Sequence, residues 1–322
     1  MPITIFKMFQ NEYNSSRIVV IGSCSIDFTT YAPRLPIPGE TLHGTKFTTS
    51  YGGKGANQCV AAAKLGGNAF MICRVGDDLW GQKYKHHLQS IGVDVSNVFI
   101  TENMTTGIAQ ITVAENGDNQ IVIVPGANGQ LKNVDVDKSK NLIASADILI
   151  GQLEVPFETV LEAFKISKGL KLLNAAPGRD NIQSILPYCT ILCVNESEAS
   201  IISELPVHNI ETATDALKKL QSMGSEIIII TLGEKGALYV SKTEPPTHVL
   251  CDAIVPVDTT GAGDAFVGAL ATYIIRYKDK PLHQLIGAAC EVASESVTKE
   301  GTQTSYPSNH IPFTKEYKYI RI

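Results

Sequence analysis

The sequence predicts an α/β protein in which a doubly wound, mainly parallel sheet carries a small β-sheet lid. Three observations support this prediction. Short β-branched runs recur along the 322 residues, helical stretches separate these runs, and two segments without helical character interrupt the alternation. Alternating β and α segments imply right-handed crossovers and a parallel sheet that helices cover on both faces. The hydrophobic content of 44% is enough for one large core.

The strands of this sheet are predicted from short apolar runs. The first run, RIVVI at residues 17–21, is ended by Gly22 and predicts a fully buried strand. Further strands are predicted over residues 69–73, 147–150, 171–173, 190–194 and 226–231. Helices are predicted over residues 81–90, 158–167, 211–223 and 267–275.

Two segments predict a separate small sheet. Residues 30–51 are rich in Thr, Pro and Gly, and residues 108–113 and 120–124 flank an Asn-Gly turn that is typical of a β-hairpin. No helices are available to cover these strands, so we expect residues of about 30–51 and 105–125 to form a lid over the carboxyl ends of the main strands. Without a repeat or linker, residues 14–322 are expected to fold as one unit, preceded by an N-terminal extension, residues 1–13.

The composition argues against several classes of function. Lys and Arg number 27 against 32 Asp and Glu, a net charge of −5, so neither a nucleic acid nor a membrane surface is an expected partner. The seven cysteines include no C-x-x-C pair, which disfavours a disulfide framework and a zinc site. No apolar run approaches the roughly 18 residues of a membrane span. We therefore expect a cytoplasmic protein, with a nuclear pool left open.

The segment DTTGAGD, residues 258–264, precedes the apolar helix and predicts a phosphate-handling turn. Gly261 and Gly263 allow backbone N–H groups on either side of Ala262 to point outward together, and the helix start adds the positive end of its dipole. Residues 261–263 would form an anion hole, and Asp264 would act as the catalytic base that takes a proton from an attacking hydroxyl. The alternative is that Asp264 only caps its helix.

A second glycine cluster, GGKGANQ at residues 52–58, combines close backbone approach with an ammonium and an amide, which suits a hydroxyl-rich ligand. A tight connection into a helix is the alternative interpretation. The cluster is not a dinucleotide-binding fingerprint, because Gln58 stands where the third small residue should be, nor a Walker A loop, because Gly55 follows Lys54. Hydrolase elbows and H-E-x-x-H zinc sites are also missing.

Together the two motifs resemble the signatures of the PfkB carbohydrate kinase family, and the resemblance extends from Gly22 to Pro307. It implies the family's lidded α/β fold and, for the branch that GGKGANQ is similar to, phosphorylation of D-ribose at O5 by ATP to give D-ribose 5-phosphate. Family kinases of adenosine, fructose or deoxyribose stay open as alternatives; a nucleoside kinase needs an aromatic slot, and Trp80 is the single Trp. A non-catalytic sugar-binding module is the alternative from another class, and a hydride-transfer enzyme is disfavoured.

The resemblance also implies which residues bind the substrates. Sugar binding is implied for Ser25, Asp27, Gly53, Lys54, Asn57, Glu154 and Asp264. Nucleotide binding is implied for Asn195, Glu198, Thr231, Gly233, Gly236 and Gly263. In this scheme Asn195 touches phosphate and Glu198 holds a water of Mg²⁺, which prefers few protein ligands. Read alone, Asn195 and Glu198 are equally typical of a helix N-cap with a capping-box acid.

A monovalent cation and a second subunit are further implications. The resemblance implies a K⁺ site at Asp258, Thr260, Ser296, Lys299, Gly301 and Ser305. A large, weakly charged cation suits a cage of carbonyl oxygens with one carboxylate, and Lys299 could contribute only its backbone carbonyl. Potassium would order the loop that carries the anion hole. The family likeness also implies a homodimer that forms through the lid.

Overall fold

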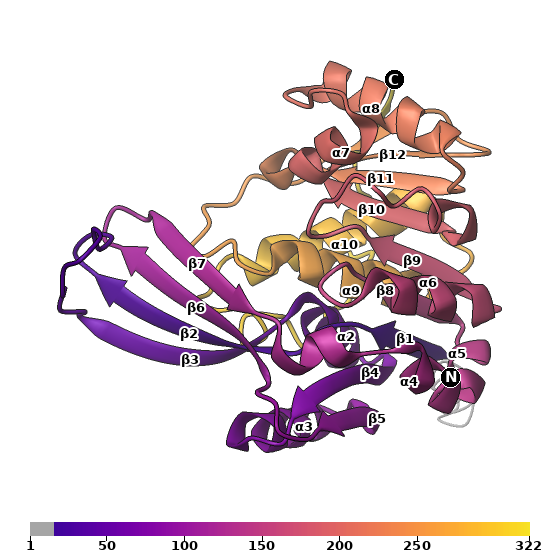
Figure 1. Ribbon diagram of the computed structural model, residues 1–322. Coiled ribbons are helices and arrows are strands. Elements are labelled where there is room, and N and C mark those ends of the chain that lie inside the picture. The colour runs from indigo at the N-terminus through magenta and orange to yellow at the C-terminus, as the bar shows by residue number, and fades with distance from the viewer. Residues whose placement is uncertain (1–15) are drawn as a thin grey trace, which may run out of the picture.

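In the computed structural model, which describes residues 16–322, a ten-stranded sheet forms the body and a four-stranded sheet projects from it (Figure 1). The large sheet runs, in spatial order, β14 (Tyr319–Arg321), β13 (Thr247–Val249), β12 (Ala237–Ser241), β11 (Ile227–Thr231), β10 (Ile191–Asn195), β9 (Leu170–Asn174), β8 (Ile148–Gly151), β1 (Arg17–Ile21), β4 (Asn68–Gly76), β5 (Asp94–Thr101).

The strands from β11 to β5 are all parallel to their neighbours, which confirms the predicted mainly parallel sheet. Every strand predicted for this sheet overlaps an observed one. The pattern did not predict β5 or the antiparallel edge of β12, β13 and β14. β12 follows β11 through a short turn without a crossover helix, so the β–α alternation that predicted the other strands is absent there.

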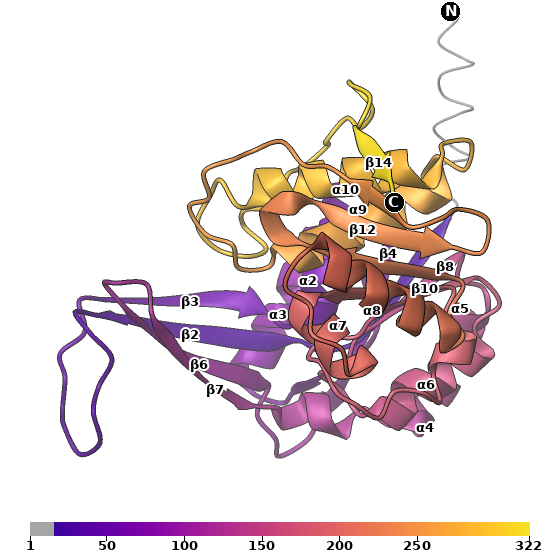
Figure 2. The ribbon, with the colours of Figure 1, turned by 90° about the horizontal axis from the view of Figure 1, so that it is seen from above.

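Helices cover both faces of the large sheet (Figures 1 and 2). One face carries α2 (Lys54–Lys64), α3 (Leu79–Ser90), α9 (Ala262–Arg276) and α10 (Leu282–Ser296). The other carries α4 (Asn133–Lys138), α5 (Lys140–Ala144), α6 (Phe157–Ile166), α7 (Glu196–Ser203) and α8 (Ile210–Ser222). Short 3-10 helices are η1 (Gly126–Gln130), η2 (Leu186–Tyr188) and η3 (Gly233–Lys235).

Strand β1 shows why a β-branched run fits the centre of this structure. Ile18 and Val20 are buried in the core beneath α2 and α9, whereas Val19 and Ile21 are buried in the core on the opposite face. A strand that is covered on both faces needs apolar side chains at every position. This explains the continuous apolar runs from which the parallel strands were predicted.

The small sheet has the strand order β3 (Lys46–Gly52), β2 (Ser25–Ala32), β6 (Gly107–Ala114), β7 (Asn119–Val124). β2 pairs antiparallel with β3 and parallel with β6. β1 ends at Ile21, as predicted from the run that precedes Gly22, and Asp27 lies within the small sheet. The sheet therefore begins at Ser25 rather than at residue 30. Its pairing with β6 is long-range, so no local pattern marks this boundary.

The register of the small sheet assigns its two faces. Directly paired residues share a face, so Asp27, Ala109 and Ile123 lie on one side, while Phe28 and Val122 lie on the other. The first side is called the inner face and the second the outer face. Across residues 16–322, no helix has both the length and the apolar character that crossing a bilayer requires. The expected extension, residues 1–13, lies outside the described residues.

Candidate active site

The turn before α9 is built by Gly261. Its φ of 77° favours glycine, and a Cβ there would lie 2.3 Å from Thr302 Cγ2. The first intrahelical hydrogen bond of α9 runs from the amide of Ala265 to the carbonyl of Gly261, so the amides of Gly263 and Asp264 precede the helix's own bonding. A helix start of this kind binds anions.

Ala262 differs from the other residues of the predicted anion hole. Its N–H donates to the carbonyl of Thr259 at 3.3 Å. Gly261, Gly263 and Asp264 line a cavity of about 180 Å³, and Ala262 is absent from this lining. The Ala262 amide is thus engaged within the turn, whereas Gly261, Gly263 and Asp264 line the cavity.

Asp264 is held by two amide side chains of α2. Asn57 Nδ2 donates to Asp264 Oδ2 at 2.9 Å, and Gln58 Nε2 donates to Oδ1 at 2.8 Å. The N-cap of α9 is Gly261, and the Asp264 carboxylate faces Asn57 and Gln58, so Asp264 is not the N-cap residue. The side chain is only 7% exposed. Burial raises the pKa of Asp264, whereas Lys54 and the two amides oppose this increase.

Two further carboxylates lie close to Asp264. Glu154 Oε2 accepts hydrogen bonds from Ser23 Oγ at 2.5 Å and from the amide of Lys54 at 2.9 Å. Burial, followed by the charges of Glu154 and Asp264, raises the pKa of Asp27 to about 7. Burial disfavours the Lys54 ammonium, but the carboxylates of Asp264 and Glu154 outweigh it and raise the pKa of Lys54. Such a group of carboxylates and one ammonium suits several hydroxyl groups.

Ser25 and Gly53 lie side by side where the small sheet joins the body. Gly53 has φ 88°, and a Cβ on it would lie 2.8 Å from the amide nitrogen of Ser25. The Ser25 hydroxyl accepts a hydrogen bond from Asn128 Nδ2 at 3.1 Å. Only glycine allows this approach of β2 to the start of α2. The predicted sugar residues are thus adjacent in space.

Two of the predicted nucleotide residues, Asn195 and Thr231, lie with Asn174 at the carboxyl ends of three neighbouring strands. Asn174, Asn195 and Thr231 end β9, β10 and β11, and they share the 180 Å³ cavity with Lys54 and Asp264. Ligands of parallel α/β sheets bind at this edge. Gly233 and Gly236, by contrast, lie in the turn after β11 and do not line this cavity.

Asn195 and Glu198 form the capping box that the sequence left open as an alternative. Asn195 Oδ1 accepts from the amide of Glu198 at 2.8 Å, and Glu198 Oε2 accepts from the amide of Asn195 at 2.9 Å. Both residues also line the cavity. Burial raises the pKa of Glu198, against the Asn195 amide and the Lys54 charge, which lower it. The capping box is therefore confirmed, and the same two residues lie at the cavity.

The residues of the expected K⁺ site lie on two adjacent loops. Asp258 Oδ1 accepts from the amide of Thr260 and Oδ2 from the amide of Gly301, both at 2.9 Å. Burial would raise the pKa of Asp258, but these bonds lower it overall. Ser296, Lys299 and Ser305 belong to the Gly301 loop and its approach, and the Lys299 ammonium lies 3.8 Å from Glu295. One carboxylate among hydroxyls and backbone carbonyls is a donor set that fits a monovalent cation.

Three polar residues at this site were missed by the sequence interpretation. Gln58 donates to Asp264 and also to Asn174 Oδ1 at 2.9 Å, and Gln152 Nε2 donates to Gln58 Oε1 at 2.6 Å. Asn174 ends β9, and Gln152 follows β8. The sequence did offer a signal for Asn174 and Gln152, because an amide side chain at the carboxyl end of a buried parallel strand indicates a ligand site.

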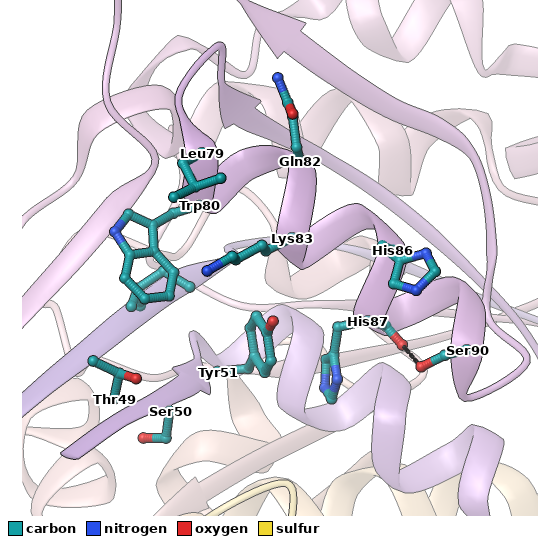
Figure 3. A pocket seen from close by; sticks show the side chains of 11 residues that line it. Thr49, Ser50, Tyr51, Leu79, Trp80, Gln82, Lys83, His86, His87 and Ser90 are labelled. Carbon is teal, nitrogen blue, oxygen red and sulfur yellow. Dashed lines mark hydrogen bonds between the residues drawn. The ribbon is translucent and has the colours of Figure 1, made fainter.

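A larger cavity of about 660 Å³ lies between α3 and the outer face of the small sheet. In Figure 3, Trp80, Lys83 and His87 of α3 lie on the side of this cavity that faces the end of β3. None of the predicted site residues lines it.

Comparison with known proteins assigns the family. The profile of the pfkB family carbohydrate kinases matches residues 15–309. This chain belongs to that family.

Among curated relatives of this pfkB family member, the ribokinase of Mus musculus is 40% identical over 301 residues, covering 92% of this chain and 93% of the relative. The deoxyribokinase of Salmonella typhi is 38% identical over 295 residues, covering 90% and 95%. The solved ribokinase of Arabidopsis thaliana complexed with ribose and ATP superposes on this chain with a TM-score of 0.84 at 29% identity, covering 92% and 96%.

Proposed function

We propose that this chain is a ribokinase, which transfers the γ-phosphoryl group of ATP to O5 of D-ribose. The observation that carries the proposal is the position of Asp264. It lies at an anion-binding helix start, between the carboxylates Asp27 and Glu154 on one side and the cavity at the ends of β9 to β11 on the other. The similarity to ribokinases over nine-tenths of the chain supports the same conclusion.

On the sugar side, Asp27 and Glu154 accept hydrogen bonds from hydroxyl groups, and Lys54 and Asn57 donate them. Charged acceptors discriminate strongly, because an analogue that lacks the hydroxyl leaves them unpaired. Asp27 projects from the inner face of the small sheet, so movement of this sheet over the sugar would exclude water that competes as the acceptor.

At the reacting centre, Asp264 accepts the proton of the attacking hydroxyl as its oxygen bonds to the γ-phosphorus. The bond between this phosphorus and the ADP oxygen breaks in line. The amides of Gly263 and Asp264, with the dipole of α9, stabilise the negative charge on the transferring group. Positioning and electrostatics supply most of the rate enhancement.

Two metal ions belong to the proposal. Glu198, which lines the cavity beside Asn195, would hold Mg²⁺ through a water, and the ion would neutralise phosphate charge when bound. Asn195 would contact the phosphate itself. The cage around Asp258 and Gly301 would hold K⁺ next to the turn that carries the anion hole. Mg²⁺ would screen the phosphate charge and K⁺ would order the turn before α9, while Asp264 accepts the proton.

Deoxyribose is the strongest competing substrate, because a deoxyribokinase is nearly as similar to this chain as the mouse ribokinase. Adenosine is disfavoured, because Trp80 packs edge-on against Phe28 on the outer face of the small sheet, opposite Asp27. The test measures ADP release with ribose, 2-deoxyribose, fructose and adenosine, with and without K⁺. We expect the highest kcat/KM with ribose and activation by K⁺; a higher value with another acceptor would contradict the assignment.

The assembly and location are part of the same proposal. The outer face of the small sheet exposes Phe47, Val122 and Val124, each at least 50% accessible, and we propose that a second copy of the chain covers it in a homodimer. We also propose a cytoplasmic location, supported by the absence of C-x-x-C pairs among the cysteines. Cell fractionation tests this location and any nuclear pool.

A further inference from the structure

Gln303, in the loop after α10, bonds both α2 and α3 through its side-chain amide. Gln303 Nε2 lies 2.9 Å from Asn57 Oδ1 and 2.9 Å from the Tyr84 hydroxyl, and Gln303 Oε1 lies 2.8 Å from His87 Nε2. The residue is 4% exposed. Lys64 Nζ fixes its backbone by donating to the Gln303 carbonyl at 2.6 Å.

The hydrogen-bond directions in this cluster determine one another. Asn57 uses Nδ2 to donate to Asp264, so its Oδ1 needs a donor, and Gln303 Nε2 supplies it. The Tyr84 hydroxyl donates to the carbonyl of Gly52 at 2.6 Å, so it accepts the second Nε2 hydrogen of Gln303. An amide turned the other way would place oxygen against oxygen at Asn57. The orientation of Gln303 therefore dictates which end of Asn57 meets Asp264.

The same cluster holds the junction of the small sheet. Gly52 is the last residue of β3, and the neighbouring Tyr51 ring stacks on His87 with centroids 3.9 Å apart and packs edge-on against Tyr84 at 4.9 Å. Figure 3 shows Tyr51 and His87 side by side beneath α3. Gln303 thus hydrogen-bonds Tyr84 and His87, the two α3 residues that contact the end of β3.

We propose that Gln303 is a positioning residue for phosphoryl transfer: its amide orients Asn57 toward Asp264 and ties that contact to the strand end that carries the small sheet. Gln303 does not touch the reacting atoms. The inference rests on the proposed function, because it gives Asn57 and Asp264 their roles there.

The test replaces the donor group of Gln303, its Nε2, with an acceptor in a side chain of nearly the same size. In Gln303→Glu, an acceptor faces and repels Asn57 Oδ1. Rotation of the amide would only turn this oxygen onto the Asp264 carboxylate, so we expect the Asn57 side chain to be displaced from Asp264. We expect kcat with ribose to fall about 100-fold, the cost of misplacing a reacting group by about 1 Å, while the KM for ATP changes less than about twofold. Gln303→Met, which removes the donor without adding an acceptor, should lower kcat about 10-fold and serves if the glutamate variant does not fold.

Gln284 provides a matched control. It is also buried, and its side chain makes two hydrogen bonds, to the carbonyl and the amide of Tyr317, far from the site. Gln284→Glu should lower the melting temperature and leave kcat within about twofold of the wild type. If both Gln303 variants behave like Gln284→Glu, losing stability but keeping kcat, the positioning role is refuted.

A crystal structure of Gln303→Glu separates this proposal from the proposed function. We expect the Asn57 amide nitrogen to have left Asp264 Oδ2, whatever the enzyme phosphorylates. An unchanged Asn57 and Asp264 contact would refute the positioning role even in an active enzyme. Failure of the wild type to phosphorylate any sugar would instead refute the function and leave this structural test intact.

Discussion

The Asp264 carboxylate is held in one orientation, and its burial disfavours the charged form. Two amides orient its oxygens, and burial raises its pKa, which suits a group that must accept a proton and then release it. We predict that Asp264→Asn lowers kcat with ribose by about 1,000-fold, because it removes the proton acceptor but keeps the size of the side chain. Calorimetry should show ribose binding retained within several-fold. Unchanged turnover would remove Asp264 from its assigned role.

Asp27 provides a prediction about pH. Its pKa is about 7 in the folded protein against 3.8 for a free side chain, so between these values the folded chain keeps a proton that the unfolded chain releases. Stability from this group is therefore present at low pH and lost as pH rises toward 7.

Asp27→Asn removes this titration. We predict that, without ligand, its melting temperature relative to wild type is higher at pH 8 than at pH 5, by on the order of 5 °C, while ribose affinity falls. Differential scanning fluorimetry at the two pH values measures this. The same change in melting temperature at both pH values would contradict the prediction.

Residues of the site were predictable where their signal is local. Asp264 and Lys54 each lie in a short glycine-rich motif, which indicates close approach of the backbone to a ligand. Gln303 and Asn57, by contrast, are 246 positions apart, and no pattern along the chain links them. The contact of the Ala262 amide with the Thr259 carbonyl, within the predicted anion hole of residues 261–263, was likewise not marked by any pattern in the sequence.

At the scale of elements, the contact between α2 and α9 decides whether Asn57 and Gln58 reach Asp264. Gly268 of α9 makes this close approach feasible, since a Cβ there would lie 2.5 Å from the carbonyl of Gln58 and 2.6 Å from Ala61 Cβ. An exposed helical Gly→Ala exchange normally stabilises by about 1 kcal/mol. Gly268→Ala should instead destabilise by about 1–3 kcal/mol and lower kcat, because it pushes α2 away.

Gly287 of α10 is the control for this variant. A Cβ there would also clash, 2.4 Å from Tyr317 Cβ, but it would not press on α2. Urea unfolding and steady-state kinetics should show that Gly287→Ala loses stability and keeps kcat. If kcat falls equally in both variants, the distance between α2 and α9 does not determine the position of Asp264.

The parallel strands could be predicted because each is a local apolar run buried on two faces. β2 could not be delimited, because its first residue is defined by pairing with β3 and β6. β7 is exposed along its whole length, so its apolar residues predicted a strand correctly without predicting what covers them.

At the scale of the whole molecule, the projecting small sheet is the proposed dimer contact (Figure 2). Val122 lies on its outer face and is 65% exposed. We predict that Val122→Asp raises the dimer dissociation constant at least about tenfold, because it puts a charge into a buried apolar contact. Sedimentation velocity measures the change. Val134→Asp, at an exposed valine of α4 on the body, should stay dimeric; dimerisation of both variants alike would exclude the outer face.

The chain enters the small sheet twice, so this sheet cannot be completed in one stretch of synthesis. Phe28 of β2 and Gln110 of β6 occupy paired positions 82 residues apart. On the ribosome, β2 and β3 emerge long before their central neighbour and present an unpaired edge together with Phe28 and Phe47. The interval during which α2, β4, α3 and β5 are translated is therefore when the nascent chain is most exposed to aggregation, and when a chaperone would have most to protect.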